Sequence, residues 1–358
     1  FWLRLAEGEN FLHIDETLGL VPLLFNVCGQ AQRTAAIRAI ESAQGSAAGA
    51  AVERARDLLV QLETLREHLW RVLLEWPAFY GAAPASASMS LLMARIEAAK
   101  RAIDGQNMLC IRPGLRRPEG VADAVTRELR SLRGMVAEHV LGMEPAQWMD
   151  AGTAGLSRWM DQTDTPAARL LRFVYGQGWE AIGQTSTHAM PDLAPDVLLA
   201  LLDGPDAAAF IAEPMLGDGA IETGPGARRQ RHPLVVDLRQ RHGQGLVTRL
   251  AARLVEIAEI TLNLPVVGDD RPAATAPGLS QLEAARGRLC HRVVLDGERI
   301  QRYCILAPTE WNFGPHGPAV QALRGVAEGG GSRVRAQAEL LIHAIDPCVG
   351  YKLEVEAA

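Results

Sequence analysis

The chain has 358 residues, of which 48% are apolar and 22% charged, and its formal net charge is −6. This composition is typical of globular proteins, and the negative charge gives no electrostatic reason to expect nucleic acid or an anionic membrane as a partner. No apolar run approaches the roughly 20 residues of a membrane-spanning helix, and nothing resembles a signal peptide. Five scattered cysteines do not suggest a disulfide framework. We therefore expect a cytoplasmic protein.

The hydropathy pattern predicts a mainly helical α+β fold in a single domain that spans residues 1–358. The first thirty residues, with WLRL, NFLHID and LVPLLFNV, are predicted to be extended segments and loops. A helix is expected from Gln30 to about Gln44. A longer one is expected from about Ala50 to Trp76, where apolar residues recur at steps of three and four and Pro77 ends the pattern. Further helices are expected near 86–104, 119–141, 166–175, 193–203 and 244–263.

The character of the sequence changes after residues 265–278, which are rich in Pro, Gly and Ala and are predicted to form a surface loop. Two β-rich runs then flank Asp296-Gly297, which is a strong signal for a hairpin. AEGGGS (327–332) is expected to be a flexible turn, and a helix from about Val334 to Ile345 follows it.

The common catalytic motifs are absent from the sequence. There is no H-E-x-x-H, no P-loop, no G-x-G-x-x-G between a strand and a helix, and no G-x-S-x-G elbow. His68 is predicted to be a hydrogen-bonded structural residue, and the arginines of GARRQRH (226–232) are predicted to form a solvated face.

Two cysteines at opposite ends of the chain have settings that favour a metal ligand. Cys28 precedes Gly29 and a predicted helix start, where the helix dipole favours a thiolate. Cys348 follows Pro347 just after the last predicted helix. Two thiolates that converge can hold a soft metal centre, whereas the alternative for each is ordinary packing in the core. A shared site predicts that the two sulfurs lie close enough to form a disulfide when the site is empty.

Six segments, taken in order, resemble the large subunit of nickel–iron hydrogenases. LAEGENFLHI is similar to that family's R-I-E-G-H-L, and NVCGQAQRTAA is similar to its C-G-x-C-x-x-x-H, with Ala31 and Ala35 in place of the second cysteine and the histidine. DPCVGY (346–351) is similar to D-P-C-x-x-C, with Tyr351 in place of the last cysteine. The other three segments, ETGPGAR (222–228), EAARGRLCH (283–291) and APTEWNFGP (307–315), are similar to E-V-G-P-L-A-R, E-A-P-R-G-A-L-G-H and V-P-T-T-W-N-F-S-P.

The resemblance implies a large-subunit-like fold and an altered metal site. In the enzymes, four thiolates hold nickel, and two of them bridge to an iron that carries cyanide and carbon monoxide. The resemblance places Cys28 and Cys348 on the two terminal ligands, with both bridging positions lost, so neither nickel nor a working hydrogenase is expected. It implies that an Fe(CN)₂(CO) fragment would be contacted by Arg286, Pro308 and Thr309.

For each of three further residues, the sequence leaves two possible roles open. Glu7 matches the family's proton-relay glutamate and could equally be an ordinary carboxylate. His291 either orients the hairpin or reaches the site, and Cys290 either packs or lies near the pocket.

In lacking the bridging cysteines, the chain resembles a group of accessory proteins, the HupK/HoxV type. That resemblance implies a non-catalytic scaffold of hydrogenase maturation. It would receive the iron fragment from small assembly chaperones and the iron-cofactor assembly complex, and pass it to the hydrogenase large-subunit precursor. The alternatives are a structural subunit of a hydrogenase- or complex I-like assembly with relic cysteines, and an enzyme with unusual metal chemistry at the same thiolates.

Overall fold

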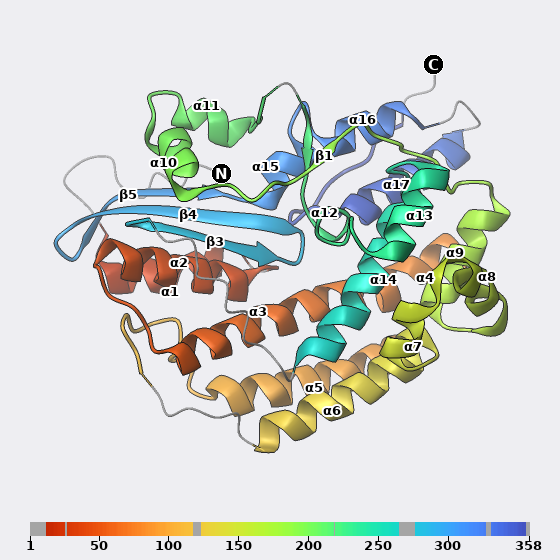
Figure 1. Cartoon of the computed structure of the whole chain (residues 1–358), viewed down its shortest axis with the longest axis horizontal. Coiled ribbons are helices and arrows are strands. Elements are labelled where there is room, and N and C mark those ends of the chain that lie inside the picture. The colour runs from red at the N-terminus through yellow and green to blue at the C-terminus, as the bar shows by residue number, and fades with distance from the viewer. Residues whose placement is uncertain are drawn as a thin grey trace.

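The structure is a computed structural model, and it describes residues 12–25, 27–116, 123–217, 219–264, 276–326 and 331–355. Long helices make up most of it, and a three-stranded antiparallel sheet lies along one side (Figure 1). The prediction of a mainly helical α+β fold is confirmed. Within these ranges, no helix has the length and apolar character needed to span a membrane.

The N-terminal half is helical apart from its loops. Two π-helical turns, η1 (Arg71–Glu75) and η2 (Ala137–Leu141), extend two of its helices. The helices are α1 (Ile14–Leu24), α2 (Gly29–Ala43), α3 (Ala50–Trp70), α4 (Trp76–Phe79), α5 (Ser86–Asp104), α6 (Asp123–Val136), α7 (Pro145–Asp150), α8 (Gly152–Gln162) and α9 (Pro166–Gly176).

The C-terminal half combines helices with all of the described strands. Its helices are α10 (Pro195–Asp203), α11 (Ala207–Ala212), α12 (Pro225–Arg228), α13 (Pro233–His242), α14 (Leu246–Asn263), α15 (Pro308–Phe313), α16 (Pro318–Arg324) and α17 (Gly331–Ile345). Its strands are β1 (His188–Ala189), β2 (Ile221–Glu222), β3 (Leu279–Ala284), β4 (Gly287–Asp296) and β5 (Arg299–Leu306).

Helix α14 lies in the middle of the molecule, where it packs against α3, α6, α7, α9, α13 and α17. Nearly every residue of α14 is buried, including Arg249, Arg253 and Glu256. A helix that is apolar on most of its surface belongs in a core, and charged side chains there require partners. The core of this fold therefore contains ion pairs, and several of them surround the candidate site.

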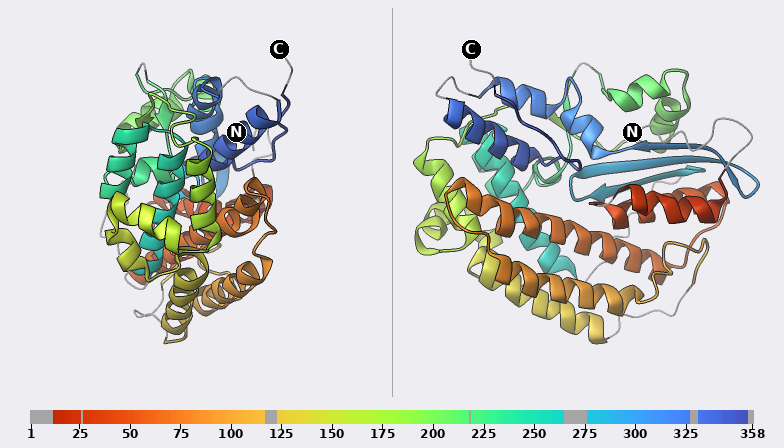
Figure 2. Two further views of the ribbon diagram at one scale, coloured as in Figure 1. Left: turned by 90° about the vertical axis from the view of Figure 1, so that its right-hand side faces the viewer. Right: turned by 180° about the vertical axis from the view of Figure 1, so that it is seen from behind.

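The three-stranded sheet has β4 in its centre, and α2 packs against β3 and β4. The predicted hairpin at Asp296-Gly297 is confirmed, with Gly297 in the left-handed region at φ 59°. On the other side of the molecule, α17 runs toward the end of this sheet (Figure 2). It thus delivers the C-terminal segment to the region where α2 begins.

Three predictions of local structure are wrong. LVPLLFNV does not form an extended segment, because Ile14, Leu18 and Val21 share one buried face of α1, and His13 and Glu16 form a capping box at its start. The long helix does not end at Pro77: after η1 the chain continues as α4, with Pro77 in its first turn, where a missing N–H costs little.

The third prediction, a turn at 327–332, is wrong for its last two residues, which already belong to α17. Residues 327–330 lie outside the described ranges, as do 265–275 of the predicted surface loop. The described remainder of that loop, 276–278, leads directly into β3, and Ala276 is buried there.

Removing a buried side chain from α14 should destabilise the whole fold. Leu254→Ala is expected to lower the free energy of unfolding by about 2–5 kcal/mol, because it leaves a cavity between packed helices. Urea denaturation followed by circular dichroism measures this change. Leu23→Ala, at a position that is 68% exposed, is the control and should change it by less than about 0.5 kcal/mol. Equal effects of the two substitutions would contradict the central position of α14.

Candidate metal centre

Cys28 is the residue immediately before α2, and its side chain is buried. Its sulfur does not cap the helix, because the carboxylate of Glu63 accepts the N–H groups of Gln30 and Ala31 at 2.7 and 2.9 Å. Burial raises the pKa of Glu63 to about 6, although these two N–H groups oppose the shift. With Glu63 as the cap, the Cys28 sulfur is available for other contacts.

The contact that Cys28 makes is with Cys348. Asp346 adopts a left-handed conformation (φ 73°) directly after α17 and turns the chain so that Cys348 lies against Cys28. The hydrogen bond with Cys348, together with burial, raises the pKa of Cys28 well above its ordinary value, and the same hydrogen bond lowers the pKa of Cys348. The prediction that the two thiols converge is confirmed, and both are free.

Arg286 lies beside this pair, in the turn between β3 and β4. Its Nη1 donates to Glu67 at 2.8 Å and its Nε donates to Asp346 at 3.1 Å. Burial alone would lower the pKa of Arg286, but the charges of Asp346, Cys348 and Glu67 raise it above its ordinary value. The guanidinium thus keeps its charge and in turn lowers the pKa of Cys348.

Asp346 accepts hydrogen bonds from more than one arginine. Arg71 of η1 approaches its Oδ1 at 2.7 Å, and Arg253 of α14 approaches its Oδ2 at 3.2 Å, in addition to Arg286. Burial alone would raise the pKa of this carboxyl, but the three guanidinium groups hold it well below its usual range. Asp346 is therefore a buried anion that fixes the segment bearing Cys348.

Thr309 approaches Cys348 from the first turn of α15, after the buried Pro308. The Thr309 hydroxyl is close enough to contribute to the lowered pKa of Cys348. It is nevertheless buried without a well-formed hydrogen bond to any residue that the structure describes. An unpartnered buried hydroxyl is uncommon, so this one can serve a bound group.

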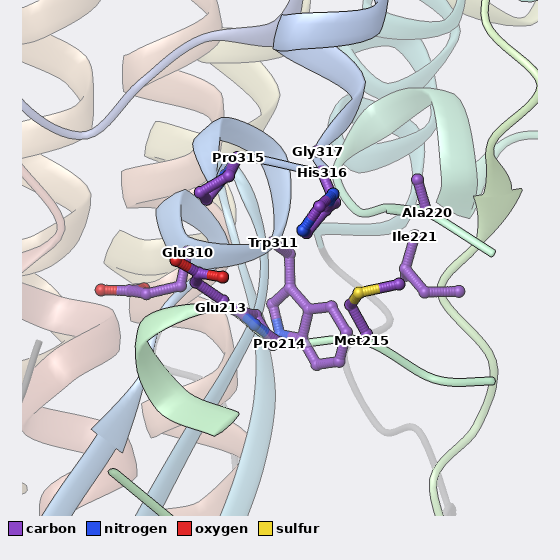
Figure 3. Close-up of a pocket in the computed structure, with 11 residues that line it drawn as sticks. Glu213, Pro214, Met215, Ala220, Ile221, Glu310, Trp311, Pro315, His316 and Gly317 are labelled. Atoms are coloured by element: carbon purple, nitrogen blue, oxygen red, sulfur yellow. The ribbon is translucent and has the colours of Figure 1, made fainter. Parts of the chain in front are cut away.

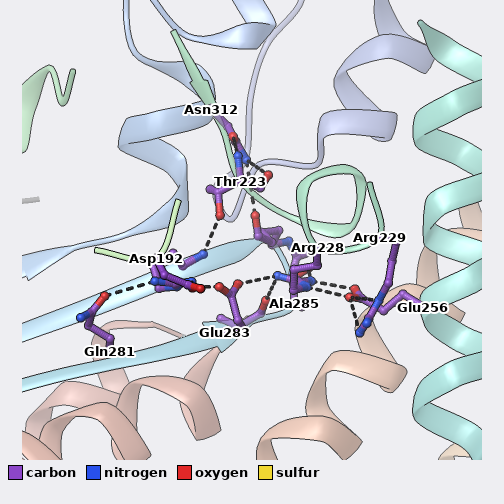
Figure 4. A network of polar contacts seen from close by, with 12 residues as sticks. Asp192, Thr223, Arg228, Arg229, Glu256, Gln281, Glu283, Ala285 and Asn312 are labelled. Atoms are coloured by element: carbon purple, nitrogen blue, oxygen red, sulfur yellow. Dashed lines mark hydrogen bonds and ion pairs between the residues drawn. The ribbon is translucent and has the colours of Figure 1, made fainter. Parts of the chain in front are cut away.

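The backbone around Arg286 is fixed by a network of polar contacts (Figure 4). Arg228 donates to the carbonyl oxygens of Ala284 and Ala285, both at 3.1 Å, and Asn312 donates to the carbonyl oxygen of Arg286 at 3.4 Å. Gly287 follows at φ 136°, and a Cβ there would lie 2.4 Å from the Thr223 side chain, so only glycine fits. This turn has little freedom to move.

The prediction that the arginines of GARRQRH form a solvated face is wrong for two of them. Arg228 is paired with Glu256 and Glu283, and Arg229 with Glu256 and Glu259. These carboxylates come from α14 and β3, which the local sequence pattern does not place beside α12. His68 also contacts Glu256, at 2.8 Å, so its predicted structural role is confirmed.

Several contributors to the site were not singled out from the sequence. They include Gln32, which donates to the Cys28 sulfur at 3.7 Å, and the charged residues Glu67, Arg71 and Arg253. The one available signal was a charged residue within an otherwise apolar stretch, as at Arg253 in LAARLVEIAEI.

The structure does not place two other predicted positions, Glu7 and Cys290, beside the cysteine pair. Glu7 falls outside the described residues. Cys290 is buried in an apolar cluster with Cys304, so it packs. A shallow surface pocket of about 250 Å³, a volume that includes space open to solvent, lies beside Trp311, Met215 and His316 (Figure 3). Neither cysteine of the pair lines it.

Comparisons with known proteins place this chain among hydrogenase-related proteins. A family model described as nickel-dependent hydrogenase matches residues 225–350. The hydrogenase expression/formation protein HupK of Azotobacter vinelandii is 31% identical over 353 residues, covering 98% of this chain and 90% of the relative. HoxV of Cupriavidus necator, also named a hydrogenase expression/formation protein, is 30% identical, covering 98% of this chain and 89% of the relative.

The chain belongs to the HupK/HoxV family of hydrogenase expression/formation proteins.

Solved hydrogenase structures share the fold of this HupK/HoxV family member. An NAD⁺-reducing [NiFe]-hydrogenase has a TM-score of 0.62 at 17% identity, covering 97% of this chain and 90% of the other. The Ni-Fe-Se hydrogenase of D. vulgaris Hildenborough in its oxidised state has a TM-score of 0.59 at 15% identity, covering 94% and 89%. The predicted large-subunit-like fold is thus confirmed.

Mild oxidation of this HupK/HoxV-type chain should join Cys28 to Cys348. The thiols are in contact and Cys348 is partly exposed, so diamide can accept the two electrons and two protons that disulfide formation releases. Mass spectrometry of unreduced tryptic peptides is expected to find the linked pair. A link between Cys290 and Cys304 in its place would contradict the geometry.

Removing the charge of Asp346 should destabilise the folded protein. Asp346→Asn leaves the buried guanidinium groups of Arg71, Arg253 and Arg286 without their shared anion. We expect the free energy of unfolding to fall by about 3–5 kcal/mol in urea denaturation. Glu298→Gln, at an exposed residue, is the control and should leave it unchanged; a similar result for Asp346→Asn would show that the carboxylate is not required.

Proposed function

We propose that this chain is a non-catalytic scaffold of hydrogenase maturation that holds an Fe(CN)₂(CO) fragment between Cys28 and Cys348. The observation that carries the proposal is the contact between these two thiols beside the charged Arg286 and the unpartnered hydroxyl of Thr309. The relatives are named hydrogenase expression/formation proteins, which supports a role in maturation.

The donors around the thiols suit the proposed cargo. Thiolates are soft ligands that favour such an iron centre. The nitrogen of an iron-bound cyanide accepts hydrogen bonds, and the Nη2 group of Arg286 forms none with the described residues. The Thr309 hydroxyl would supply a second donor, and the buried Pro308 would supply an apolar wall.

The charge of the proposed fragment is also compatible with the charged groups around the two thiols. An iron(II) ion with two cyanides is neutral, so two thiolates would give the bound fragment a charge of −2. A guanidinium that keeps its charge, as Arg286 does, lowers the cost of burying that charge.

The positions of the lost bridging cysteines support a cargo without nickel. Ala31 is fully buried, and its N–H is bound to Glu63. Tyr351 lies beside His343 of α17, with ring centroids 6.3 Å apart. Neither supplies a sulfur, and a four-thiolate nickel site cannot be built from two thiolates.

The two-thiolate site also suggests how the iron fragment would be received and released. We propose that small hydrogenase-assembly chaperones and the iron-cofactor assembly complex supply the fragment, and that a hydrogenase large-subunit precursor receives it. Two protein ligands hold a metal less tightly than four, so transfer to a four-cysteine acceptor would be downhill. Glu7 stays a predicted contact of the same site.

Infrared spectroscopy tests the proposal directly. The full chain is purified without oxygen from a hydrogenase-producing host that lacks the large-subunit precursor, so that cargo accumulates. We expect CO and CN stretching bands in the wild type and their loss in the Cys28→Ser/Cys348→Ser double variant.

A matched double variant, Cys110→Ser/Cys290→Ser, serves as the control, because both of these cysteines are buried outside the pair. It should keep the bands. Bands that persist in the Cys28/Cys348 variant, or a wild type with none, would refute the proposal.

A further inference from the structure

A buried row of hydrogen bonds leads from the sheet to Cys28. Tyr303 of β5 contacts Nδ1 of His291 of β4 at 2.7 Å, and His291 Nε2 contacts the Gln32 oxygen at 2.8 Å. Gln32 of α2 then reaches the Cys28 sulfur through its Nε2 at 3.7 Å. All three side chains are at most 2% exposed, so water does not compete for these bonds.

The direction of these hydrogen bonds follows from Tyr303. Burial lowers the pKa of His291 to about 3 and raises that of Tyr303, so the imidazole is neutral and the phenol keeps its proton. A buried tyrosine hydroxyl has to donate its proton, and His291 Nδ1 is the acceptor that the described residues offer. The imidazole proton is then on Nε2, which donates to the Gln32 oxygen. The amide nitrogen of Gln32 is thereby left facing the sulfur.

A purely structural role for Gln32 would not need hydrogen bonds that run in this direction. Helix α2 already packs along β3 and β4, and Glu63 already caps its start. A leucine at residue 32 would preserve packing between helix and sheet. What it would lack is a donor aimed at one of the two sulfurs.

We propose that Gln32 is a positioning residue for the cargo: its amide N–H donates to the Cys28 sulfur that binds the metal, and Tyr303, acting through His291, fixes that orientation. The inference rests on the proposed function and adds a specific determinant of how tightly one ligand is held. Outer contacts of this kind typically change metal affinity 10–100-fold.

Cadmium binding tests the inference without the iron fragment. The reduced full chain is titrated with Cd²⁺ while the thiolate-to-cadmium absorption is followed in the ultraviolet. Gln32→Leu is expected to weaken binding by about 10-fold or more, and it should also lower the melting temperature somewhat, because the buried His291 Nε2–H loses its acceptor. Tyr303→Phe, which leaves Gln32 in place, should weaken it by a smaller factor, and it provides a second variant if Gln32→Leu does not fold.

Gln30→Leu is the matched control. Gln30 lies on the same helix and donates to the sulfur of Cys110 at 3.6 Å, outside the pair. Its replacement should leave Cd²⁺ affinity as in the wild type. Equal affinity in the wild type and Gln32→Leu, equal loss in both glutamine variants, or no Cd²⁺ binding by the wild type would each overturn the inference.

Infrared bands separate this inference from the proposed function. In loaded protein, losing the hydrogen bond makes the Cys28 sulfur a stronger electron donor, so the CO stretch should move to lower wavenumber in Gln32→Leu and not in Gln30→Leu. An unmoved band in Gln32→Leu would overturn the positioning role. If the wild type carries no CO or CN bands while the cadmium difference persists, the proposed function fails and the role of Gln32 at Cys28 stands.

Discussion

The carboxylate of Asp346 binds guanidinium groups from three separate elements: Arg71 of η1, Arg253 of α14 and Arg286 of the β3–β4 turn. Ion pairs this deeply buried bring little net stability compared with an apolar core. What they provide is geometry, because one carboxylate lies within ion-pair distance of guanidinium groups from three elements. That position places the segment bearing Cys348 beside α2. The arrangement at the two thiols therefore depends on a charge cluster in the core.

The cluster would also suit the negatively charged fragment that we propose as the cargo. Arg286 is held by Glu67 and Asp346 on its protein side and still faces Cys348. Asn312 donates to the carbonyl oxygen of Arg286, and Arg228 donates to the carbonyl oxygens of the two preceding residues, so the backbone that carries this side chain is held by polar contacts. When the hydrogen-bond donors of a site are already in place, the site rearranges little on binding its ligand, and the free-energy cost of binding is small. In the function that we propose, two thiolates without the bridging sulfurs would bind the fragment through fewer bonds, as reversible transfer requires.

Much of the fold could be predicted from local patterns, and the failures have common causes. The long amphipathic helices and the Asp-Gly hairpin were predictable, since their periodicity and turn chemistry are local. The helix α1 was missed because its short apolar runs were interpreted as extended segments, whereas the capping box at His13 and one apolar face stabilise a helix. The buried pairing of Arg228 was missed because its carboxylate partners, on α14 and β3, come from remote parts of the chain.

By itself, the sequence determined which residue types are available: two cysteines after the loss of their bridging partners, and the Arg286 and Thr309 segments in family order. It also determined most of the long helices, through the spacing of apolar residues. Only the tertiary structure decided that Cys28 and Cys348 touch and that Gln32 reaches the sulfur through a row of bonds from the sheet. The reason is physical: side chains hundreds of residues apart meet only when burial of the helices and pairing of the buried charges fix one common arrangement.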